Sequence, residues 1–314
     1  MVNIEGETAV VRRQKTIYWS LEKGDLLPLL LMLPSVLLIG FVMLAPLCYG
    51  AYLSLFNFNF GRFVPATDFV GLGNYATFLK DPTAWKSILN TVLFSAGAIC
   101  GEFAIGTLIA VLLFQANQRA AAIMRPLITI PLLISPIVVG LIWRYIYDPQ
   151  GILYWFLGLL GLSIQSFPGV TSASTALLSV IFAHWWEVVP FVVIVLTAGL
   201  VSIPVELYEA AYIDGAGVFS SFWRITFPLL ADVYMVILLI SGVDTIKIFD
   251  IIYSLTGGGP YNSTISISMY AFDQAFMQTN LSYAMTLSVV AMIVAFTLFG
   301  VPFIQRNRLR STKR

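Results

Sequence analysis

Ionisable side chains inside long apolar stretches are the first feature of this sequence that could carry chemistry. Glu102 stands in one such stretch, His184 and Glu187 in another, and Asp244 and Lys247 in a third. Charged groups at bilayer depth are costly, so they usually face the interior of a helix bundle or a transport pathway. The pattern therefore predicts either buried pairs between helices or a polar lining for a solute.

The segment AHWWEVVPF, residues 183–191, leaves two interpretations open. His184 and Glu187 are three residues apart, so they could pair on one face of a helix. Trp186 and its neighbour Trp185 offer flat apolar surfaces of the kind that stack on sugar rings. Alternatively, the tryptophans form an aromatic belt at the membrane surface beside a kink at Pro190.

The other ionisable groups in the apolar stretches also allow two interpretations each. Lys247 lies three residues from Asp244 and three from Asp250, so an ion pair with either aspartate is one interpretation. In the other, these side chains line the path and bind the hydroxyl groups or an anionic substituent of a substrate. Glu102 could form a buried hydrogen bond to a neighbouring helix or line the same path.

Catalysis and metal binding are not indicated. The chain has one histidine and no zinc spacing, whereas zinc requires three or four protein ligands. The glycine run at residues 257–260 lacks the Lys-Ser/Thr pair with which a P-loop holds phosphate and magnesium. We therefore expect no metal, no cofactor, no enzyme activity and no ATP site of that type in this chain.

Composition places these residues in a membrane. Of 314 residues, 59% are hydrophobic and only 11% charged, and the mean hydropathy is +0.88. A soluble domain carries about a quarter charged residues. We predict an all-α protein that crosses the membrane several times and contacts lipid, and the net charge of +1 gives no basic field for nucleic acid.

Six apolar stretches have about the 20-residue length that a spanning helix needs. They are residues 26–55, 88–114, 127–146, 176–200, 229–253 and 284–304. The chain thus divides into an N-terminal segment at 1–25, a transmembrane domain at 26–304 and a basic tail at 305–314.

Most of the 17 basic residues fall on one side of these spans. That side carries Arg12, Arg13, Lys15, Lys23, Arg119, Arg125, Arg224, Arg306, Arg308, Arg310, Lys313 and Arg314. Cytoplasmic loops are enriched in Lys and Arg, so both termini are predicted to be cytoplasmic. The polar segment YEAAYIDGAGVFSSFWRITFPLL, residues 208–230, is then a cytoplasmic loop.

This loop predicts two short helices that join at glycine. Pro204 suits a first helical turn, and a face of small residues at Ala210 and Ala211 would allow another surface to approach closely. Gly215 and Gly217 can end the first helix. From the residues alone, the loop either docks to a partner or rests on lipid headgroups as an amphipathic hairpin.

The same loop resembles the EAA loop of ABC-importer permeases. The resemblance rests on Glu209-Ala210-Ala211, Gly215, Ile225 and Phe227-Pro228, with phenylalanine at 227 where the family usually has leucine. Three further segments are similar to the carbohydrate-uptake branch of these permeases. They are FVGLGNYATFLKDPTAW from residue 69 with the Asn-Thr pair at 90–91, FDIIYSLTGGGPYNST at 249–264 and AFMQTNLSYAMTLSVV at 275–290.

The resemblance implies a six-helix type I permease in the bacterial inner membrane that takes up a sugar or sugar-like solute. It implies four kinds of partner: a second permease chain, two ATPase subunits that hydrolyse ATP, an extracytoplasmic solute-binding protein and the substrate. The loop at about 203–228 would couple the permease to the ATPase. The residues expected to carry this coupling are Glu209, Ala210, Ala211, Gly215 and Pro228. The candidate residues of the substrate pathway are Trp186, Glu187, Asp244 and Lys247.

An alternative of a different class is a proton-coupled secondary transporter. Glu102, Glu187 and Asp244 would then form a proton relay across the membrane. This hypothesis predicts uptake that collapses with the proton gradient and survives loss of ATP. It gives no role to the loop at 208–230.

Overall fold

The computed structural model describes residues 27–59, 68–162 and 167–305, with side chains from residue 31 onward. The described residues form helices and one isolated β-bridge, between Phe56 and Phe69, and no longer strand. The basic segments predicted at 1–25 and beyond 305 lie outside the described residues. The chain divides into two units, residues 1–52 and 53–314, which are treated separately below.

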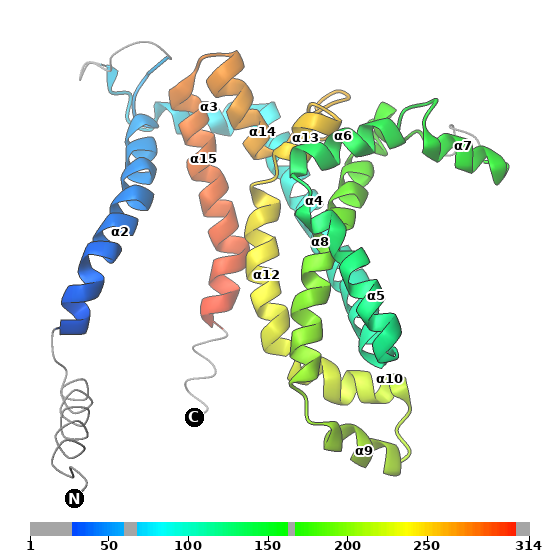
Figure 1. Ribbon diagram of the computed structural model, residues 1–314. Coiled ribbons are helices and arrows are strands. Elements are labelled where there is room, and N and C mark those ends of the chain that lie inside the picture. Colours follow the sequence, from blue (N-terminus) through cyan, green and yellow to red (C-terminus); the bar gives the residue numbers. More distant parts are fainter. Residues whose placement is uncertain (1–26, 60–67, 163–166, 306–314) are drawn as a thin grey trace, which may run out of the picture. The chain divides into compact units, whose positions relative to one another are not determined.

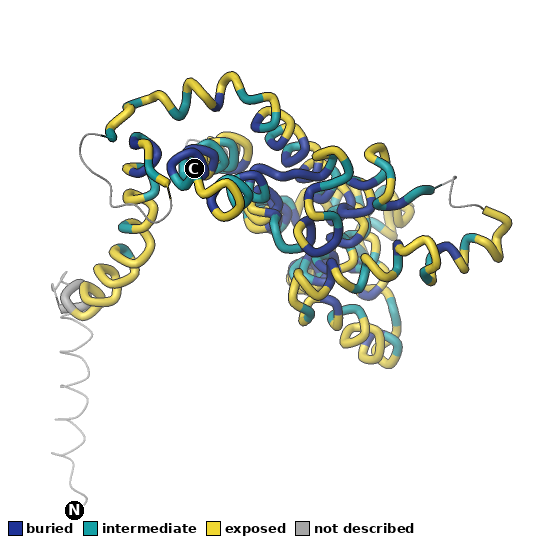
Figure 2. Tube along the Cα trace, turned by 90° about the horizontal axis from the view of Figure 1, so that it is seen from above, coloured by how far each residue is buried: buried dark blue, intermediate teal, exposed yellow. Residues whose placement is uncertain are grey.

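The first unit contributes one long helix, α2 (Leu27–Leu53). It is apolar on all sides, and residues 31–52 of its candidate span, Leu31–Leu53, are exposed or half-buried, while Leu53 at its end is buried. Figure 2 shows it exposed along its length. Such a helix is stable only where lipid or another chain covers it.

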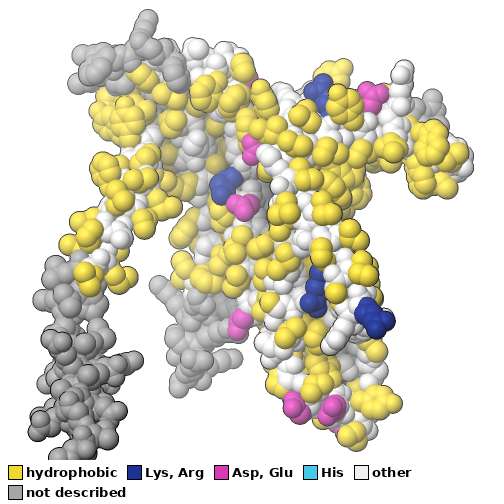
Figure 3. All heavy atoms as spheres, in the orientation of Figure 1, with side chains coloured by type: hydrophobic (Ala, Val, Ile, Leu, Met, Phe, Trp, Pro, Cys, Tyr) yellow, Lys and Arg dark blue, Asp and Glu magenta, His cyan; other side chains and the backbone are white. Residues whose placement is uncertain are grey.

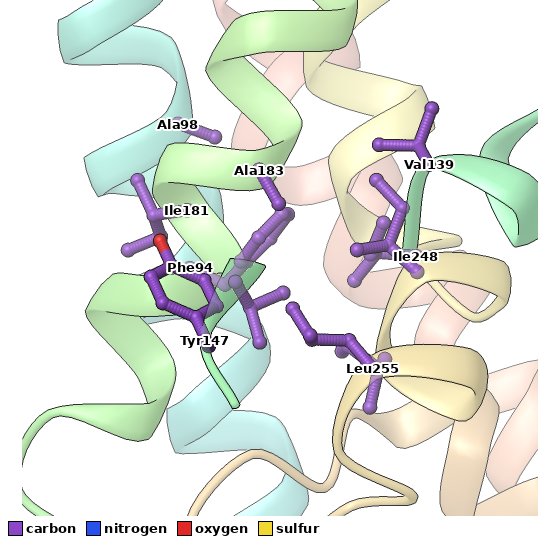
Figure 4. Close-up of a cluster of buried hydrophobic side chains, with 11 residues drawn as sticks. Phe94, Ala98, Val139, Tyr147, Ile181, Ala183, Ile248 and Leu255 are labelled. Carbon is purple, nitrogen blue, oxygen red and sulfur yellow. The ribbon is translucent and has the colours of Figure 1, made fainter. Parts of the chain in front are cut away.

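The second unit is centred on two long helices, α4 (Pro82–Gln115) and α8 (Ala176–Val201), which pack along each other (Figure 1). Asp81 caps α4 by accepting a hydrogen bond from the Thr83 amide. The two helices approach closely where the Trp185 ring lies against Gly101, since a Cβ at this position would clash with the ring. A cluster of buried apolar residues, including Phe94, Ile181 and Ile248, joins these helices to their neighbours (Figure 4).

Two of the predicted spans are broken in the structure. The span predicted at 127–146 consists of α5 (Gln118–Thr129), the 3₁₀ turn η2 (Ile130–Leu133) and α6 (Pro136–Ile146), with a bend of 99°. Pro131 and Pro136 explain the break, because proline lacks the amide hydrogen that a continuous helix requires.

The span predicted at 229–253 is also wrong in its limits. α12 (Ala231–Ile246) ends before Lys247, and the chain turns into a separate short helix, α13 (Asp250–Leu255), that packs on α6. The last span, predicted at 284–304, comprises α15 (Leu281–Ala295) and the π-helix η6 (Phe296–Gly300).

Short helices occupy both ends of the bundle. At one end lie α3 (Gly73–Lys80), α13 and α14 (Ile267–Phe272), and at the other α9 (Val205–Ile213) and α10 (Val218–Ser221) (Figure 1). The remaining elements are α7 (Ile152–Leu159), η3 (Gly169–Thr171), η4 (Phe222–Thr226), α11 (Phe227–Leu229) and η5 (Asp273–Met277).

Among the described residues, four helices are long and apolar enough to cross a membrane, or up to six if each bent pair counts as one span. Figure 3 shows hydrophobic side chains over much of the visible surface, with few charged ones among them. The all-α, multi-span prediction is confirmed by this architecture.

Candidate functional site

The segment α9–α10 forms a hairpin, hereafter the α9–α10 hairpin, that projects from one end of the bundle (Figure 1). Pro204 precedes the first turn of α9 as its N-cap, one position earlier than the sequence suggested. Glu206 lies in that first turn, where a negative charge favours the positive end of the helix dipole. Within α9, Ala210 is exposed and Ala211 is half-buried.

Gly215 ends α9 by adopting a left-handed conformation, with φ of +75°. The amide of Ala216 then donates to the carbonyl of Ala211 at 2.9 Å and closes the helix end. A Cβ at Gly215 would meet nothing within 4 Å, so the backbone conformation alone requires glycine here. Gly217 does not end α9 as predicted; it caps α10 in an extended conformation.

The segment that leads from the tip of the hairpin back to the bundle is helical throughout. α10 continues into the π-helix η4, then α11, and a bend of 65° leads into α12. Pro228 lies in α11 just before this bend, away from the tip that Gly215 forms. Tyr208 and Thr226 join α9 to η4 through hydroxyl groups 2.9 Å apart.

Aromatic rings connect the hairpin to the bundle. Ring centroids are 5.1 Å apart for Trp223 and Phe227, 5.3 Å for Phe227 and Tyr234, and 5.5 Å for Tyr234 and Phe103. The Tyr234 hydroxyl also lies 2.8 Å from that of Thr107 on α4. A displacement of the hairpin would therefore act directly on α12 and α4.

The tip of the hairpin exposes large apolar side chains. Tyr212 and Ile213 are 82% and 83% exposed, and Val218 and Phe219 on α10 are also largely exposed. Acidic side chains lie beside them at this end of the molecule (Figure 3). Apolar and acidic groups on a small-residue scaffold form a surface suited to a basic protein partner.

Within the bundle, Glu102 pairs with His184, which was not part of the proton relay considered above. Its Oε1 atom lies 3.0 Å from Nε2 of His184, and the Glu102 side chain is fully buried between α4 and α8. The predicted hydrogen bond from Glu102 to a neighbouring helix is therefore present. The suggested pairing of His184 with Glu187 is absent among the described residues, because His184 Nδ1 has no partner and Nε2 faces Glu102.

The two tryptophans of α8 have different surroundings. Trp185 donates from its indole nitrogen to the carbonyls of Gly97 and Ala98, so it is part of the α4–α8 contact. Trp186 is partly exposed and lines a cavity of about 740 Å³ beside Trp143. Trp185 lines the same cavity, and Trp186 is the more exposed ring of the two.

Asp244 and Lys247 form the ion pair that the sequence suggested, with 2.9 Å between Oδ1 and Nζ. Their side chains are 61% and 66% exposed in the isolated chain, at the end of α12. An exposed ion pair on a spanning helix requires water or a polar partner beside it. Glu187 is buried on α8 and is not part of this pair.

A polar cluster at the end opposite the hairpin escaped the sequence analysis. Asp81 Oδ2 accepts hydrogen bonds of 2.6 Å from the hydroxyls of Tyr270 and Tyr283, which joins α4, α14 and α15. Burial alone would raise the Asp81 pKa, but these bonds and the backbone amides of Thr83 and Ala84 lower it below its ordinary value. Only the Asp-Pro start of α4 signals this residue in the sequence.

The loop at 256–266 is joined to α4 by hydrogen bonds from side chains of that helix. Lys86 Nζ donates to the carbonyl of Tyr261 at 2.7 Å, and Asn90 Nδ2 donates to the carbonyls of Asn262 and Ile265. Tyr261 itself is 89% exposed. The loop that contains the glycine run is thus held against α4.

Comparison with known proteins identifies the family. A family model described as "Binding-protein-dependent transport system inner membrane component" matches residues 102–308, which is more than half of the chain. The match includes the α9–α10 hairpin and the spans on either side of it.

Curated relatives and solved structures agree with this match. The chain is 35% identical over 238 residues to the trehalose/maltose transport system permease protein MalF of Thermococcus litoralis, covering 75% of this chain and 80% of that one. It is 29% identical to the sn-glycerol-3-phosphate transport system permease protein UgpA of Agrobacterium fabrum, covering 90% and 96%. In fold it matches a chain of a bacterial alginate ABC transporter with a TM-score of 0.76, at 21% identity, covering 93% and 97%.

Proposed function

The chain belongs to the family of binding-protein-dependent transport system inner membrane components, and we propose that it imports a sugar or sugar-like solute as one permease subunit of an ATP-driven transporter. The observation that carries the proposal is the α9–α10 hairpin with its exposed apolar tip. The two relatives reported above support the solute class, since they are permeases of transport systems for trehalose/maltose and for sn-glycerol-3-phosphate.

The hairpin docks on a cytoplasmic ATPase in this proposal. Ala210 and Ala211 allow close approach because they lack long side chains, and Glu209 offers a charge to a basic residue of the partner. Gly215 holds the turn at the tip in its left-handed conformation. Closure of two ATPase subunits on ATP would then move the hairpin.

The movement reaches the spans through two connections. Pro228 and the 65° bend between α11 and α12 make a natural pivot, because proline leaves the helix short of one hydrogen bond. The aromatic contacts from Trp223 through Phe227 to Tyr234 link the hairpin to α12 and α4. Both spans would change position with the nucleotide state of the ATPase.

The solute path lies between this chain and a second permease. Asp244 and Lys247 would contribute polar groups to that interface, and Trp186 an apolar face for a sugar ring, with Glu187 buried one residue further along α8. An extracytoplasmic binding protein would deliver the solute at the end opposite the hairpin. This arrangement gives the exposed ion pair a polar environment.

The proton relay receives less support. Glu102 is fully buried against His184, and Asp244 is paired with Lys247, so these two carboxylates have separate partners. A relay needs carboxylates that exchange protons with one another or with water. The family membership independently favours an ATP-driven importer.

The proposal is tested by purifying the tagged chain from its native membranes in mild detergent and identifying its companions by mass spectrometry. We expect an ATPase with a P-loop and a second permease to accompany it, and uptake by reconstituted vesicles to require ATP. A chain that purifies alone and transports solute on a proton gradient would contradict the proposal.

The path assignment has its own test. Lys247→Met should change the relative uptake of neutral and anionic sugars by several-fold, while assembly with the ATPase stays intact. Lys80→Met, at the end of α3, serves as the matched control because it removes the same charge outside the spans. Equal uptake profiles for both variants and the parent would assign Lys247 to the ion pair alone.

A further inference from the structure

Two adjoining cavities form a groove along α8, named here the α5–α8 groove. The larger, about 740 Å³, is lined by apolar residues of α4, α5, α6, α7 and α8. The smaller, about 480 Å³, lies between α5 and α8, and Ile128 lines both. Apart from its tryptophan and tyrosine rings, the larger cavity has no polar side chain in its lining.

The smaller cavity brings a charge to one end of this apolar groove. Arg125 lines it and is the one charged residue in the lining of either cavity. In the described part of the chain, Glu102 is in contact with His184 and Asp244 is paired with Lys247, and Arg125 has no acidic partner there. Thr197, on the opposite wall, has a buried hydroxyl without a hydrogen-bond partner in the described part of the chain.

Position along the bundle sets the depth of this charge. α4 ends beside the α9–α10 hairpin, since Phe114 and Gln115 line a cavity together with hairpin residues, and α5 starts at Gln118. Arg125 lies seven residues further on, about 10 Å along a helix axis. An arginine at that depth extends its guanidinium toward the headgroup layer while its stem stays in apolar surroundings.

An occupant must therefore combine a long apolar part with an anionic end. A phospholipid has both, because its acyl chain matches the apolar walls and its phosphate accepts paired hydrogen bonds from a guanidinium. A partner helix would fill the apolar part but would need a carboxylate at the depth of Arg125. We propose that the smaller cavity of the α5–α8 groove binds an anionic phospholipid of the leaflet on the hairpin side, with its phosphate on Arg125 and its acyl chain on the apolar walls of α5 and α8. The larger cavity, which Trp186 lines, is left to the solute path.

The site lies next to the moving parts of the transporter. Ile128 and Thr129 precede the 99° break between η2 and α6, and the groove wall on α8 continues to Val201, close to the start of the hairpin. A bound lipid would therefore contact both the break and the helix that leads to the coupling hairpin. This role goes beyond the proposed transport function and does not depend on which solute is carried.

The test uses the protein purified with whatever subunits accompany it and placed in phosphatidylcholine nanodiscs. A small fraction of phosphatidylglycerol carrying a photoreactive group on its acyl chain is added, and labelled peptides are mapped by mass spectrometry. We expect labelling in residues 113–129 and 193–201, well above that by the matching phosphatidylcholine probe. Arg125→Gln should lower it roughly five-fold, as expected for loss of one basic residue at an anionic surface.

Matched variants separate a lipid site from general lipid contact. Arg119→Gln removes a charge from the same helix outside the groove and should leave labelling unchanged, and Arg125→Lys should retain most of it. Melting temperature and size-exclusion profile check that each variant is folded. Equal labelling by the two probes, or equal effects of Arg119→Gln and Arg125→Gln, would overturn the proposal.

A third outcome would assign the groove to a partner. A photoreactive phenylalanine analogue at position 198, on the wall of the smaller cavity, would then crosslink to the second permease, and neither lipid probe would label the groove. We expect this analogue to crosslink to lipid instead. Crosslinking to protein would overturn the lipid assignment.

Discussion

The two ends of the bundle are built in opposite ways. At the α3–α14 end, polar side chains bind one another and the backbone: Asp81 holds Tyr270 and Tyr283, and Lys86 and Asn90 hold the loop at 256–266. At the other end, the α9–α10 hairpin exposes Tyr212, Ile213 and Phe219. The first end is stabilised by contacts within the chain, whereas the second leaves its apolar surface uncovered.

This difference indicates which end of the bundle is held together without a partner. Hydrogen bonds to a carboxylate are strong, and the partly buried ones on Asp81 join three helices. Exposed apolar side chains on a short hairpin are unfavourable in water and become favourable when another protein covers them. We therefore expect substitutions at the two ends to separate stability from transport.

The largest effect should come from the hairpin. Ala210→Trp places a bulky ring on the exposed face of α9 and should reduce transport at least 100-fold, because it prevents close approach of the ATPase. Gly215→Pro and Ala211→Trp should also abolish transport, the former because proline cannot adopt the positive φ of this turn. Uptake and ATPase assays on reconstituted vesicles, with membrane content measured by immunoblot, check these outcomes.

Ala122→Trp is the matched control for the hairpin variants. Ala122 is exposed on α5, outside the hairpin, so the same enlargement there should leave transport near the parent level. Normal uptake by Ala210→Trp would show that the hairpin does not dock through its small-residue face.

A smaller effect, on stability, is expected at the opposite end. Asp81→Ala removes the acceptor for two tyrosine hydroxyls and should cost about 2 kcal/mol of folding free energy. The melting temperature of the purified protein should fall by several degrees, while ATPase stimulation is kept below that temperature. Tyr261→Ala, which removes an 89% exposed side chain from the same region, should leave the melting temperature unchanged.

Equal melting temperatures for Asp81→Ala and Tyr261→Ala would mean that the Asp81 cluster does not hold this end together. The contrast between the two ends would then rest on apolar packing alone.

A still smaller effect is expected for Tyr208→Phe. This variant removes the hydroxyl that lies 2.9 Å from Thr226 and joins α9 to η4, at a cost of about 1 kcal/mol. Hydrogen exchange of the α9 amides should become several-fold faster, with transport reduced only slightly. Thr77→Val, which removes an exposed hydroxyl on α3, is the control and should leave exchange in the hairpin unchanged.

The smallest effect is a dependence of folding stability on pH through Asp81. Because the Asp81 pKa is lower in the folded protein than in the unfolded chain, the ionised carboxylate stabilises the fold above the unfolded pKa of about 3.9. This stabilisation is lost as pH falls through the folded value. The difference in melting temperature between the parent and Asp81→Asn should therefore be constant from pH 7 to 5 and shrink below about pH 4; a difference that grows in acid would contradict the assignment.

Much of the fold followed from the sequence because long apolar runs admit few structures in a membrane. The limits of the straight spans were predicted closely for α8, at 176–200 against Ala176–Val201. The broken spans were not, because an apolar run has the same composition whether it is straight or bent. Pro131 and Pro136 were visible in the sequence, but proline also occurs inside the unbroken helix α8, at Pro190.

The candidate site divides in the same way. The sequence by itself determined the hairpin, because Pro204, two adjacent alanines and Gly215 fix local backbone conformations that need no distant contact. Only the tertiary structure decided that Glu102 pairs with His184, that Trp185 donates a hydrogen bond to α4, and that Asp81 meets Tyr270 and Tyr283. Those partners lie 82 to 202 residues apart, and their meeting depends on how the helices pack around one another.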